Sequence, residues 1–125
     1  MKIYVAGKWE DRRSVQDIQG ALLLKGYEIT KDWTIDDDDE GDAGYPVINV
    51  VEDIRGVAMA DAYVGYFENE HNYRGTLIEF GAALALRKPC YIIGHAIDKC
   101  IFIKHPLVTQ FDSVEEFLMI VGGIL

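Results

Sequence analysis

The sequence predicts an α/β fold in which a mostly parallel five-stranded sheet is covered by helices on both faces. Short apolar runs alternate along the chain with segments of helical periodicity, which is the pattern of successive βαβ units. The runs are continuously apolar, as expected for strands that are buried on both faces. The chain has 125 residues, 50% of them hydrophobic, which suits one domain with a substantial core. We therefore predict a single domain over residues 1–125, with right-handed crossovers.

The start of the chain is predicted to form a strand, a helix and a second strand. Residues 3–6 are apolar and end at Gly7, which suits a buried strand that runs into a turn. A helix follows, and Gly26 is a suitable residue just beyond its end. Residues 27–30 are the second predicted strand. The apolar positions of the expected helix are Val15, Ile18, Leu22 and Leu23.

An acidic segment separates this unit from the next helix. Residues 33–44 carry many carboxylates without periodicity, which is typical of a solvated loop. A cation-binding loop is the alternative, although the ligand spacing of a calcium loop is absent. Pro46 suits the first turn of the helix that follows, and Asp53 lies beside its apolar stripe. That stripe comprises Val47, Val50, Val51, Ile54, Val57 and Ala58.

The second half of the chain is predicted to add three strands and two helices. Residues 62–67 are the third strand, and a polar loop over residues 68–74 leads into a helix within the stretch 72–86. Residues 89–93 and 108–111 are the fourth and fifth strands. The last helix is capped by Asp112 or Ser113 and is expected to bury Val114, Phe117, Leu118 and Val121.

The composition argues against several classes of function. A net charge of −9 and a pI near 4.6 disfavour general binding to nucleic acid, which requires clustered Lys and Arg. Residues 1–7 lack the pattern of a signal peptide, and no apolar run approaches the ~18 residues of a membrane span, so we expect a cytoplasmic protein. Cys90 and Cys100 are not spaced as a metal pair, and no dinucleotide fingerprint is present. We expect neither a metal nor a cofactor.

Ligands of such parallel sheets bind outside the carboxyl ends of the strands. Three segments are expected to meet at that edge, namely residues 7–9, 68–75 and 94–95. Glu79 lies one turn into the helix that follows the second of these segments. A capping box is one interpretation, in which Thr76 caps the helix and Glu79 bonds back to the cap amide. A functional carboxylate, stabilised in its ionised form by the helix N-terminus, is the other.

Three further residues are candidates for this crevice, each with a structural alternative. Tyr4 lies on the first strand, where ordinary core packing is equally expected. Trp9 follows that strand, so that it either stacks on a base or staples the next helix. Asp53 is either a ligand-facing acid or a solvated helical residue.

Three stretches of the chain, taken together and in order, resemble the nucleoside 2-deoxyribosyltransferase family. They are residues 3–9 (IYVAGKW), 52–57 (EDIRGV) and 75–89 (GTLIEFGAALALRKP). The last contains the most specific motif, G-[ST]-x-x-E-x-G-x-A followed by K-P. That family also includes the 2'-deoxynucleoside 5'-phosphate N-hydrolases. The resemblance implies a flavodoxin-like, Rossmann-like three-layer sandwich and an enzyme that acts on nucleosides or nucleotides.

The resemblance also implies a role for each of four residues. Glu79 matches the glutamate that attacks the anomeric carbon of the deoxyribosyl group and holds it covalently. Asp53 matches an aspartate that holds and orients the substrate, and Tyr4 a tyrosine that positions the nucleophile. Trp9 matches an aromatic residue beside the base. An ionised carboxylate close to the anomeric carbon suits the oxocarbenium-like transition state of a retaining glycosyl transfer.

The chain departs from the transferase pattern at two places. Transferases carry an aspartate six residues before the nucleophile, where this chain has Tyr73, so that Glu68 or Glu70 becomes the candidate proton donor. They also use an asparagine from a neighbouring subunit, and residues 99–102 supply none. Transfer to another base, hydrolysis of a nucleoside 5'-monophosphate, and binding without turnover therefore remain as alternative functions. The candidate substrate-binding residues are Gly7, Lys8, Trp9, Tyr73, Arg74, Gly75 and Thr76.

Within this set, the start of the helix at Gly75 and Thr76 is expected to hold a 5'-phosphate, with charge supplied by Arg74 or Lys8. We also expect a homo-oligomer, both from the resemblance and because the apolar tail over residues 120–125 would otherwise be exposed.

Overall fold

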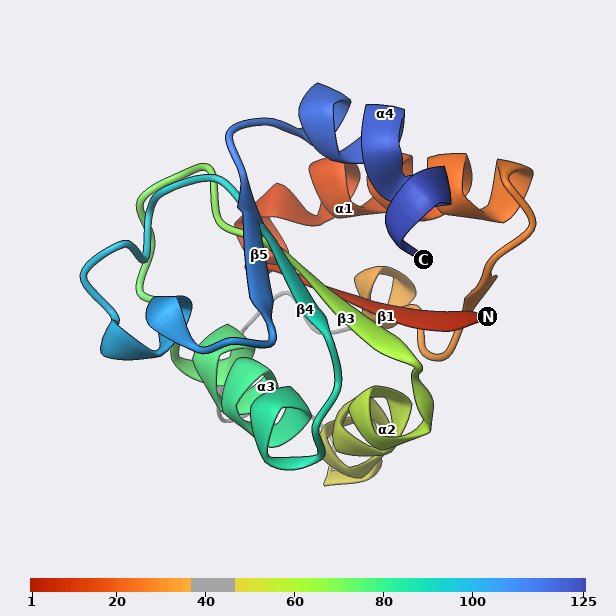
Figure 1. The fold of residues 1–125 in the computed structure, drawn as a ribbon. Coiled ribbons are helices and arrows are strands. Elements are labelled where there is room, and N and C mark those ends of the chain that lie inside the picture. The colour runs from red at the N-terminus through yellow and green to blue at the C-terminus, as the bar shows by residue number, and fades with distance from the viewer. Residues whose placement is uncertain (37–46) are drawn as a thin grey trace.

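The computed structural model describes residues 1–36 and 47–125 and has the predicted α/β architecture (Figure 1). All pairings in the described sheet are parallel, and the strand order is β2-β1-β3-β4-β5. The strands are β1 (Lys2–Ala6), β2 (Glu28–Ile29), β3 (Ala62–Tyr66), β4 (Cys90–Ile93) and β5 (Val108–Phe111). The helices are α1 (Arg12–Leu24), α2 (Val47–Met59), α3 (Arg74–Ala85) and α4 (Val114–Ile124). Short 3-10 turns are η1 (Trp9–Asp11), η2 (Trp33–Ile35) and η3 (Ile101–Lys104).

The helices form two layers around the sheet. Figure 1 shows α1 and α4 on one face and α2 and α3 on the other, which gives the predicted three-layer sandwich. The strand order is the flavodoxin-like order, and the chain reverses direction across the sheet between β1 and β3. This topological switch point places the ends of β1 and β3 side by side, where Ala6 pairs with Gly65.

Several predicted boundaries are confirmed. Gly26 has a φ of +93°, the left-handed conformation that ends α1. Ser113 caps α4, because its side chain accepts a hydrogen bond of 3.1 Å from the Glu116 amide. Of the apolar positions predicted for α1, Val15, Ile18 and Leu22 are buried, and Leu23 is 55% exposed. The second strand is shorter than predicted, with two residues in β2.

The predicted buried stripe of α2 is also wrong. Val57 is buried together with Gly56, whereas the other large apolar residues of the stripe lie toward solvent. A helix that is apolar around most of its circumference has no single stripe from which the buried face can be read. The exposed members of the predicted stripe are Val47, Val50, Val51, Ile54 and Ala58.

The predicted solvated loop over residues 33–44 is wrong at its start. Trp33 and Thr34 are buried in η2, and Trp33 Nε1 donates a hydrogen bond of 2.7 Å to the Val5 carbonyl oxygen. This bond ties the segment after β2 to the end of β1. The remainder of that loop, and with it the alternative of a cation-binding loop, lies outside the described residues.

Along the described chain, no helix is both long enough and apolar enough to cross a membrane.

Candidate active site

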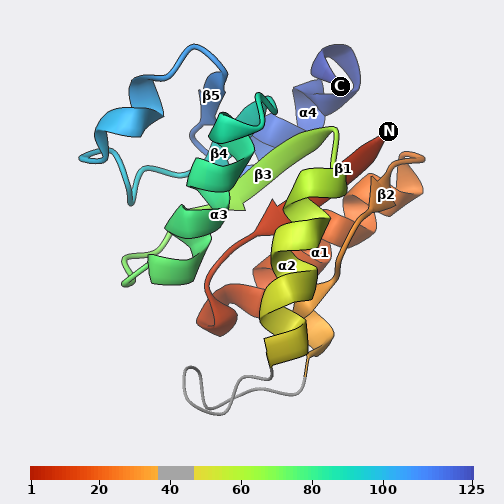
Figure 2. The ribbon, with the colours of Figure 1, turned by 90° about the horizontal axis from the view of Figure 1, so that it is seen from below.

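The turn after β1 and the loop after β3 meet at the carboxyl edge of the sheet, as predicted. Thr76 Oγ1 donates a hydrogen bond of 3.1 Å to the Gly7 carbonyl oxygen, which joins the start of α3 to the end of β1. Lys8 Nζ donates to the Asn72 carbonyl oxygen at 2.8 Å. These contacts lie at the edge of the sheet where the ligand crevice is expected. Figure 2 shows α2 and α3 side by side on the same face of the sheet.

A tyrosine and a glutamate that are far apart in the sequence are joined by a hydrogen bond between β1 and α3. Tyr4 Oη donates a hydrogen bond of 2.8 Å to Glu79 Oε2. Tyr4 is fully buried on β1, and its ring stacks on Tyr63 with ring centroids 6.4 Å apart. Glu79 lies on α3 and keeps part of its surface open. The hydroxyl is therefore fixed by the core, while the carboxylate lies between the core and the crevice.

The environment of Glu79 favours its neutral form. Burial raises the pKa of Glu79 from 4.5 to about 8, the Tyr4 hydrogen bond lowers it, and the charge of Asp53 raises it. Burial also raises the pKa of Tyr4 well above its ordinary range, and the charges of Glu79 and Asp53 raise it further. Tyr4 is thus a hydrogen-bond donor at any ordinary pH. Asp53, from α2, acts electrostatically on both groups.

The capping-box interpretation of Thr76 and Glu79 is wrong. The N-cap of α3 is Tyr73, and Leu77 N bonds to the Tyr73 carbonyl oxygen at 2.9 Å, so that Thr76 is already inside the helix. The Thr76 hydroxyl is used by Gly7 instead. Glu79 therefore accepts the hydrogen bond from Tyr4 and does not serve in a capping box with Thr76.

Tyr73 does not join the crevice residues, in contrast to the prediction. Its side chain is 4% exposed and packs edge-on against Phe67, with ring centroids 4.7 Å apart. Its hydroxyl donates to the Asn69 carbonyl oxygen. The ring therefore serves as an internal support for the loop between β3 and α3.

Trp9 lies at the turn, but one of its neighbours covers it. The Arg12 guanidinium is 4.5 Å from the centroid of the indole, a cation–π distance, and the ring is tilted against Trp33 at 6.5 Å. Trp9 is only half-buried. The predicted packing onto the following helix is thus present, and part of the ring remains accessible.

The start of α3 combines open space with positive charge. An added Cβ at Gly75 would meet no atom within 4 Å. With its amide oxygen turned towards Arg74, Asn72 accepts hydrogen bonds from Nε at 3.0 Å and from Nη2 at 3.1 Å. Lys8, from the turn after β1, binds the backbone oxygen of the same Asn72. The cationic side chains of Lys8 and Arg74 therefore both contact this residue.

Comparison with known proteins supports the same fold. No protein-family model matches the chain, and no curated protein matches it. Among solved structures, a 2-deoxyribosyltransferase from Bacillus psychrosaccharolyticus superposes with a TM-score of 0.73 at 18% identity, covering 94% of this chain and 90% of that one. The chain shares the fold of a nucleoside-processing enzyme. A CMP N-glycosidase from Clostridium botulinum superposes with a TM-score of 0.69 at 16% identity, with 100% of both chains covered.

This likeness gives the predicted resemblance a structural counterpart. The two solved structures act on a deoxyribosyl group and on CMP, respectively, as their names state. At identities of 16–18%, the likeness shows a shared fold only. The chemistry of this chain has to follow from its own residues.

One polar pair at the end of η1 was not predicted from the sequence. Asp11 Oδ2 lies 3.1 Å from His71 Nε2, and Asp11 Oδ1 accepts a hydrogen bond of 2.9 Å from Asn69 Nδ2. The pair links η1 to the loop after β3 across 60 residues of sequence, counted from residue 11 to residue 71. Neither residue belongs to a recognisable motif, so only the folded chain identifies it.

His95 does not face the other crevice residues, although it follows β4 as predicted. Its two ring nitrogens lie 2.8 Å from Asp98 Oδ2 and 2.6 Å from Asp112 Oδ1. Gln110 Nε2 donates to the Gly94 carbonyl oxygen at 2.9 Å in the same cluster. The cluster ties the loop after β4 to the loop after β5.

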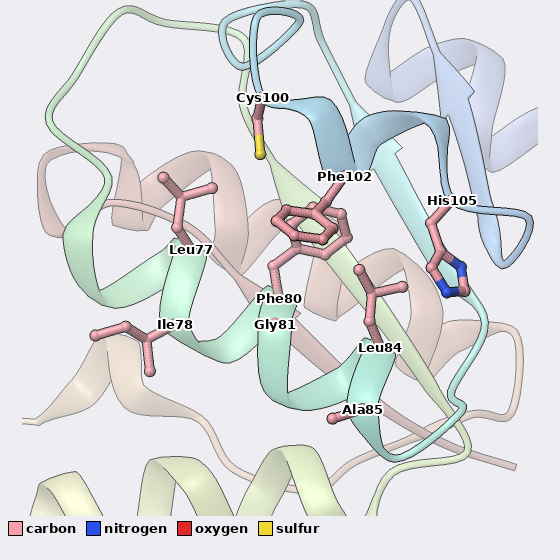
Figure 3. A pocket seen from close by; sticks show the side chains of 9 residues that line it. All are labelled: Leu77, Ile78, Phe80, Gly81, Leu84, Ala85, Cys100, Phe102 and His105. Atoms are coloured by element: carbon pink, nitrogen blue, oxygen red, sulfur yellow. The ribbon is translucent and has the colours of Figure 1, made fainter.

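A separate apolar pocket of about 590 Å³ lies on the other flank of α3, between that helix and the segment around η3 (Figure 3). Glu79 is not among its lining residues, so this pocket is distinct from the crevice. Its lining residues are Leu77, Ile78, Phe80, Gly81, Leu84, Ala85, Cys100, Phe102 and His105. Elsewhere in residues 1–36 and 47–125, no group of three or more His, Cys, Asp or Glu is placed to hold a metal ion.

Proposed function

We propose that this protein cleaves the N-glycosidic bond of a 2'-deoxynucleoside or of its 5'-monophosphate through a covalent glycosyl intermediate on Glu79, with transfer of the deoxyribose to another base. The observation that carries the proposal is the Tyr4–Glu79 hydrogen bond of 2.8 Å at the switch-point crevice. A fold shared with a deoxyribosyltransferase and an N-glycosidase supports it.

In the proposed first step, the ionised Glu79 carboxylate attacks the anomeric carbon. A carbon–oxygen bond forms to Glu79, the carbon–nitrogen bond to the base breaks, and its electron pair leaves with the base, which takes up a proton. In the second step the nitrogen of another base attacks the same carbon, gives up its proton, and displaces Glu79 as a carboxylate. The carboxylate stabilises the oxocarbenium-like charge in both transition states.

Tyr4 and Asp53 act in this scheme by positioning and by charge. The Tyr4 hydroxyl holds one carboxylate oxygen, which leaves the other free to approach the anomeric carbon. Asp53 raises the pKa of Glu79, and a less stabilised carboxylate is a stronger nucleophile once it is ionised. In this proposal Asp53 also holds the sugar.

The remaining predicted residues form the proposed substrate-binding surface. Gly7, Lys8 and Trp9 border the crevice from the β1 side. Arg74, Gly75 and Thr76 border it from the start of α3, where a phosphate would meet helix amides and two nearby cations. Tyr73 contributes through its backbone and as the support of this loop.

Hydrolysis is a second candidate for the fate of the sugar, and two observations favour it. The residue six positions before Glu79, Tyr73, is buried and carries no carboxylate into the crevice. Lys8 and Arg74 both lie against Asn72, which suits a 5'-monophosphate. In this variant water replaces the acceptor base in the second step.

The proposal is tested by product analysis. The purified protein is incubated with deoxynucleosides and their 5'-monophosphates, with and without a free acceptor base, and products are separated by chromatography. We expect that the protein releases base and that Glu79→Gln abolishes this release. Glu115→Gln, a matched change at an exposed residue of α4, should keep it. A new nucleoside in the presence of acceptor indicates transfer, and free deoxyribose or its phosphate indicates hydrolysis. Tight nucleotide binding without product would instead support a binding module.

A further inference from the structure

At Gly56, α2 lies close against the Tyr4 ring of β1. An added Cβ at this position would lie 2.9 Å from Tyr4 Cδ1 and 3.1 Å from Tyr4 Cε1. It would also lie 2.7 Å from Lys31 Cβ. Distances this short are incompatible with van der Waals packing, so the observed depth of α2 requires a residue without a side chain.

A hydrogen bond fixes the helix at the same point. Thr30 Oγ1, just after β2, donates to the Gly56 carbonyl oxygen at 2.7 Å. Gly56 is therefore held from one side by Thr30 and touches the Tyr4 ring on the other. Along α2, Gly56 and Val57 are the buried residues, so this contact is at the centre of the packed face of the helix.

Asp53 lies one helical turn before this contact. Residues three apart on a helix share a face, so the depth set at Gly56 also sets the position of Asp53. Three titratable groups act electrostatically with the Glu79 carboxyl, and each comes from a different element: Tyr4 on β1, Asp53 on α2 and Tyr63 on β3. Of these elements, β1 and β3 are almost wholly buried, whereas most residues of α2 are not.

We propose that Gly56 is a positioning residue of the candidate active site, where its missing side chain lets α2 approach β1 closely enough for Asp53 to act on Tyr4 and Glu79. This inference rests on the proposed function for its catalytic consequence. The effect of Gly56 on the positions of Tyr4 and Asp53 can be tested without any catalytic turnover.

Substitution by alanine is expected to displace α2 rather than Tyr4. The Tyr4 ring is fully buried and stacked on Tyr63, whereas most of α2 is exposed. A retreat of α2 removes Asp53 from Glu79 and admits solvent, and both changes favour the ionised carboxyl. We expect the ionisation midpoint of Glu79 to fall by about one pH unit in Gly56→Ala, within the range that a nearby charge and burial produce.

The first measurement is the pH titration of the Glu79 side-chain carboxyl by carbon-13 NMR, assigned with Glu79→Gln. Gly20→Ala is the matched control, because it places a methyl group on a helix where nothing lies within 4 Å. Thr30→Val is the second variant, and it should shift the midpoint in the same direction as Gly56→Ala by freeing the Gly56 carbonyl oxygen. An unchanged midpoint in folded Gly56→Ala, or in Thr30→Val if the former fails to fold, would overturn the inference.

The second measurement is a double-mutant cycle on base release with Asp53→Asn. We expect Gly56→Ala to lower kcat about tenfold in the wild-type background, and by less than about twofold when Asp53 is already replaced, because coupled residues are not additive. Equal losses in both backgrounds would show a merely structural role for Gly56. If the wild-type protein releases no base from any substrate, the proposed function fails, while the NMR titration still decides whether Gly56 positions Asp53.

Discussion

Tyr4 and Glu79, 75 residues apart in sequence, are joined by a hydrogen bond of 2.8 Å that links the first strand of the sheet to α3. The donor is fully buried and the acceptor lies at the crevice. A buried hydroxyl that cannot ionise in the ordinary pH range is a fixed donor, and it holds the carboxylate in one rotamer. This bond is the most direct link between the core of the domain and its proposed chemistry.

Replacing Tyr4 by phenylalanine should slow base release without preventing folding. A hydrogen bond to a charged group contributes about 1.5–3 kcal/mol, which corresponds to a loss of about 10- to 100-fold in kcat. The pKa of Glu79 should rise further above about 8, since this bond lowers it. The measurement is kcat as a function of pH. Tyr27→Phe, at a partly buried position between α1 and β2, is the control, and an equal loss there would contradict a specific role for Tyr4.

The pKa of Glu79 predicts a pH-dependent stability. Its folded-state pKa of about 8 lies above the ordinary 4.5, so the unfolded chain ionises first as the pH rises. The free energy of unfolding should therefore decrease between these two values, by an amount of order a few kcal/mol. In Glu79→Gln this decrease should disappear. Urea unfolding at pH 5 and pH 8 measures the change in the free energy of unfolding. An equal change in wild type and variant would show that a group other than Glu79 causes it.

Much of the fold could be predicted because the strands carry their own signal. Continuous apolar runs identified β1, β3 and β4, and the flanking residues Gly26 and Ser113 marked two helix boundaries correctly. The depth and face of α2 could not be predicted, because its apolar residues surround the helix. Gly56 sets the buried face of α2 through its close approach to Tyr4. The sequence does not show which residue a single helical glycine packs against.

The candidate site was predicted in part, for a similar reason. A local motif identified the position of Glu79, but it allowed a capping role equally well, and only the partners Tyr4 and Gly7 exclude that role. The inward rotation of Tyr73 depends on the tertiary contact with Phe67, which local sequence does not encode.

The Thr76 hydroxyl provides a direct test of the capping correction. Because it bonds to the Gly7 carbonyl oxygen and not to a helix amide, Thr76→Val should leave the helix content unchanged. The lost hydrogen bond should lower the free energy of unfolding by about 1 kcal/mol. Circular dichroism and urea unfolding together measure both quantities. A loss of helical signal comparable to that of Ser113→Ala, which removes a true cap, would restore the capping-box interpretation.

The expected homo-oligomer remains a prediction that sedimentation can test. Ile120 and Ile124 near the end of the chain are 43% and 39% exposed, in keeping with an apolar tail that is not covered within one subunit. We expect the protein to sediment as a dimer or larger assembly at micromolar concentration, and Ile124→Glu to weaken it. Leu24→Glu, on a 91% exposed residue of α1, is the control. A monomer across the concentration range would contradict the prediction.

The His95 cluster predicts a second set of titrations, in which His95, like Glu79, loses its stabilisation as the pH rises, whereas Asp98 loses it as the pH falls. Hydrogen bonds to Asp112 and Asp98 raise the pKa of His95 above its ordinary 6.5, and bonds from Gln110 and then His95 lower the pKa of Asp98. The stabilisation from His95 is therefore complete below pH 6.5 and is lost as the pH rises through the raised value. NMR titration should place the His95 midpoint above 6.5, and Asp112→Asn should lower it. Asp61→Asn, whose carboxylate binds the Lys2 amide at the opposite end of β1, should leave the midpoint unchanged. An unchanged midpoint in Asp112→Asn would show that the 2.6 Å contact between His95 Nε2 and Asp112 Oδ1 does not stabilise protonated His95 in solution.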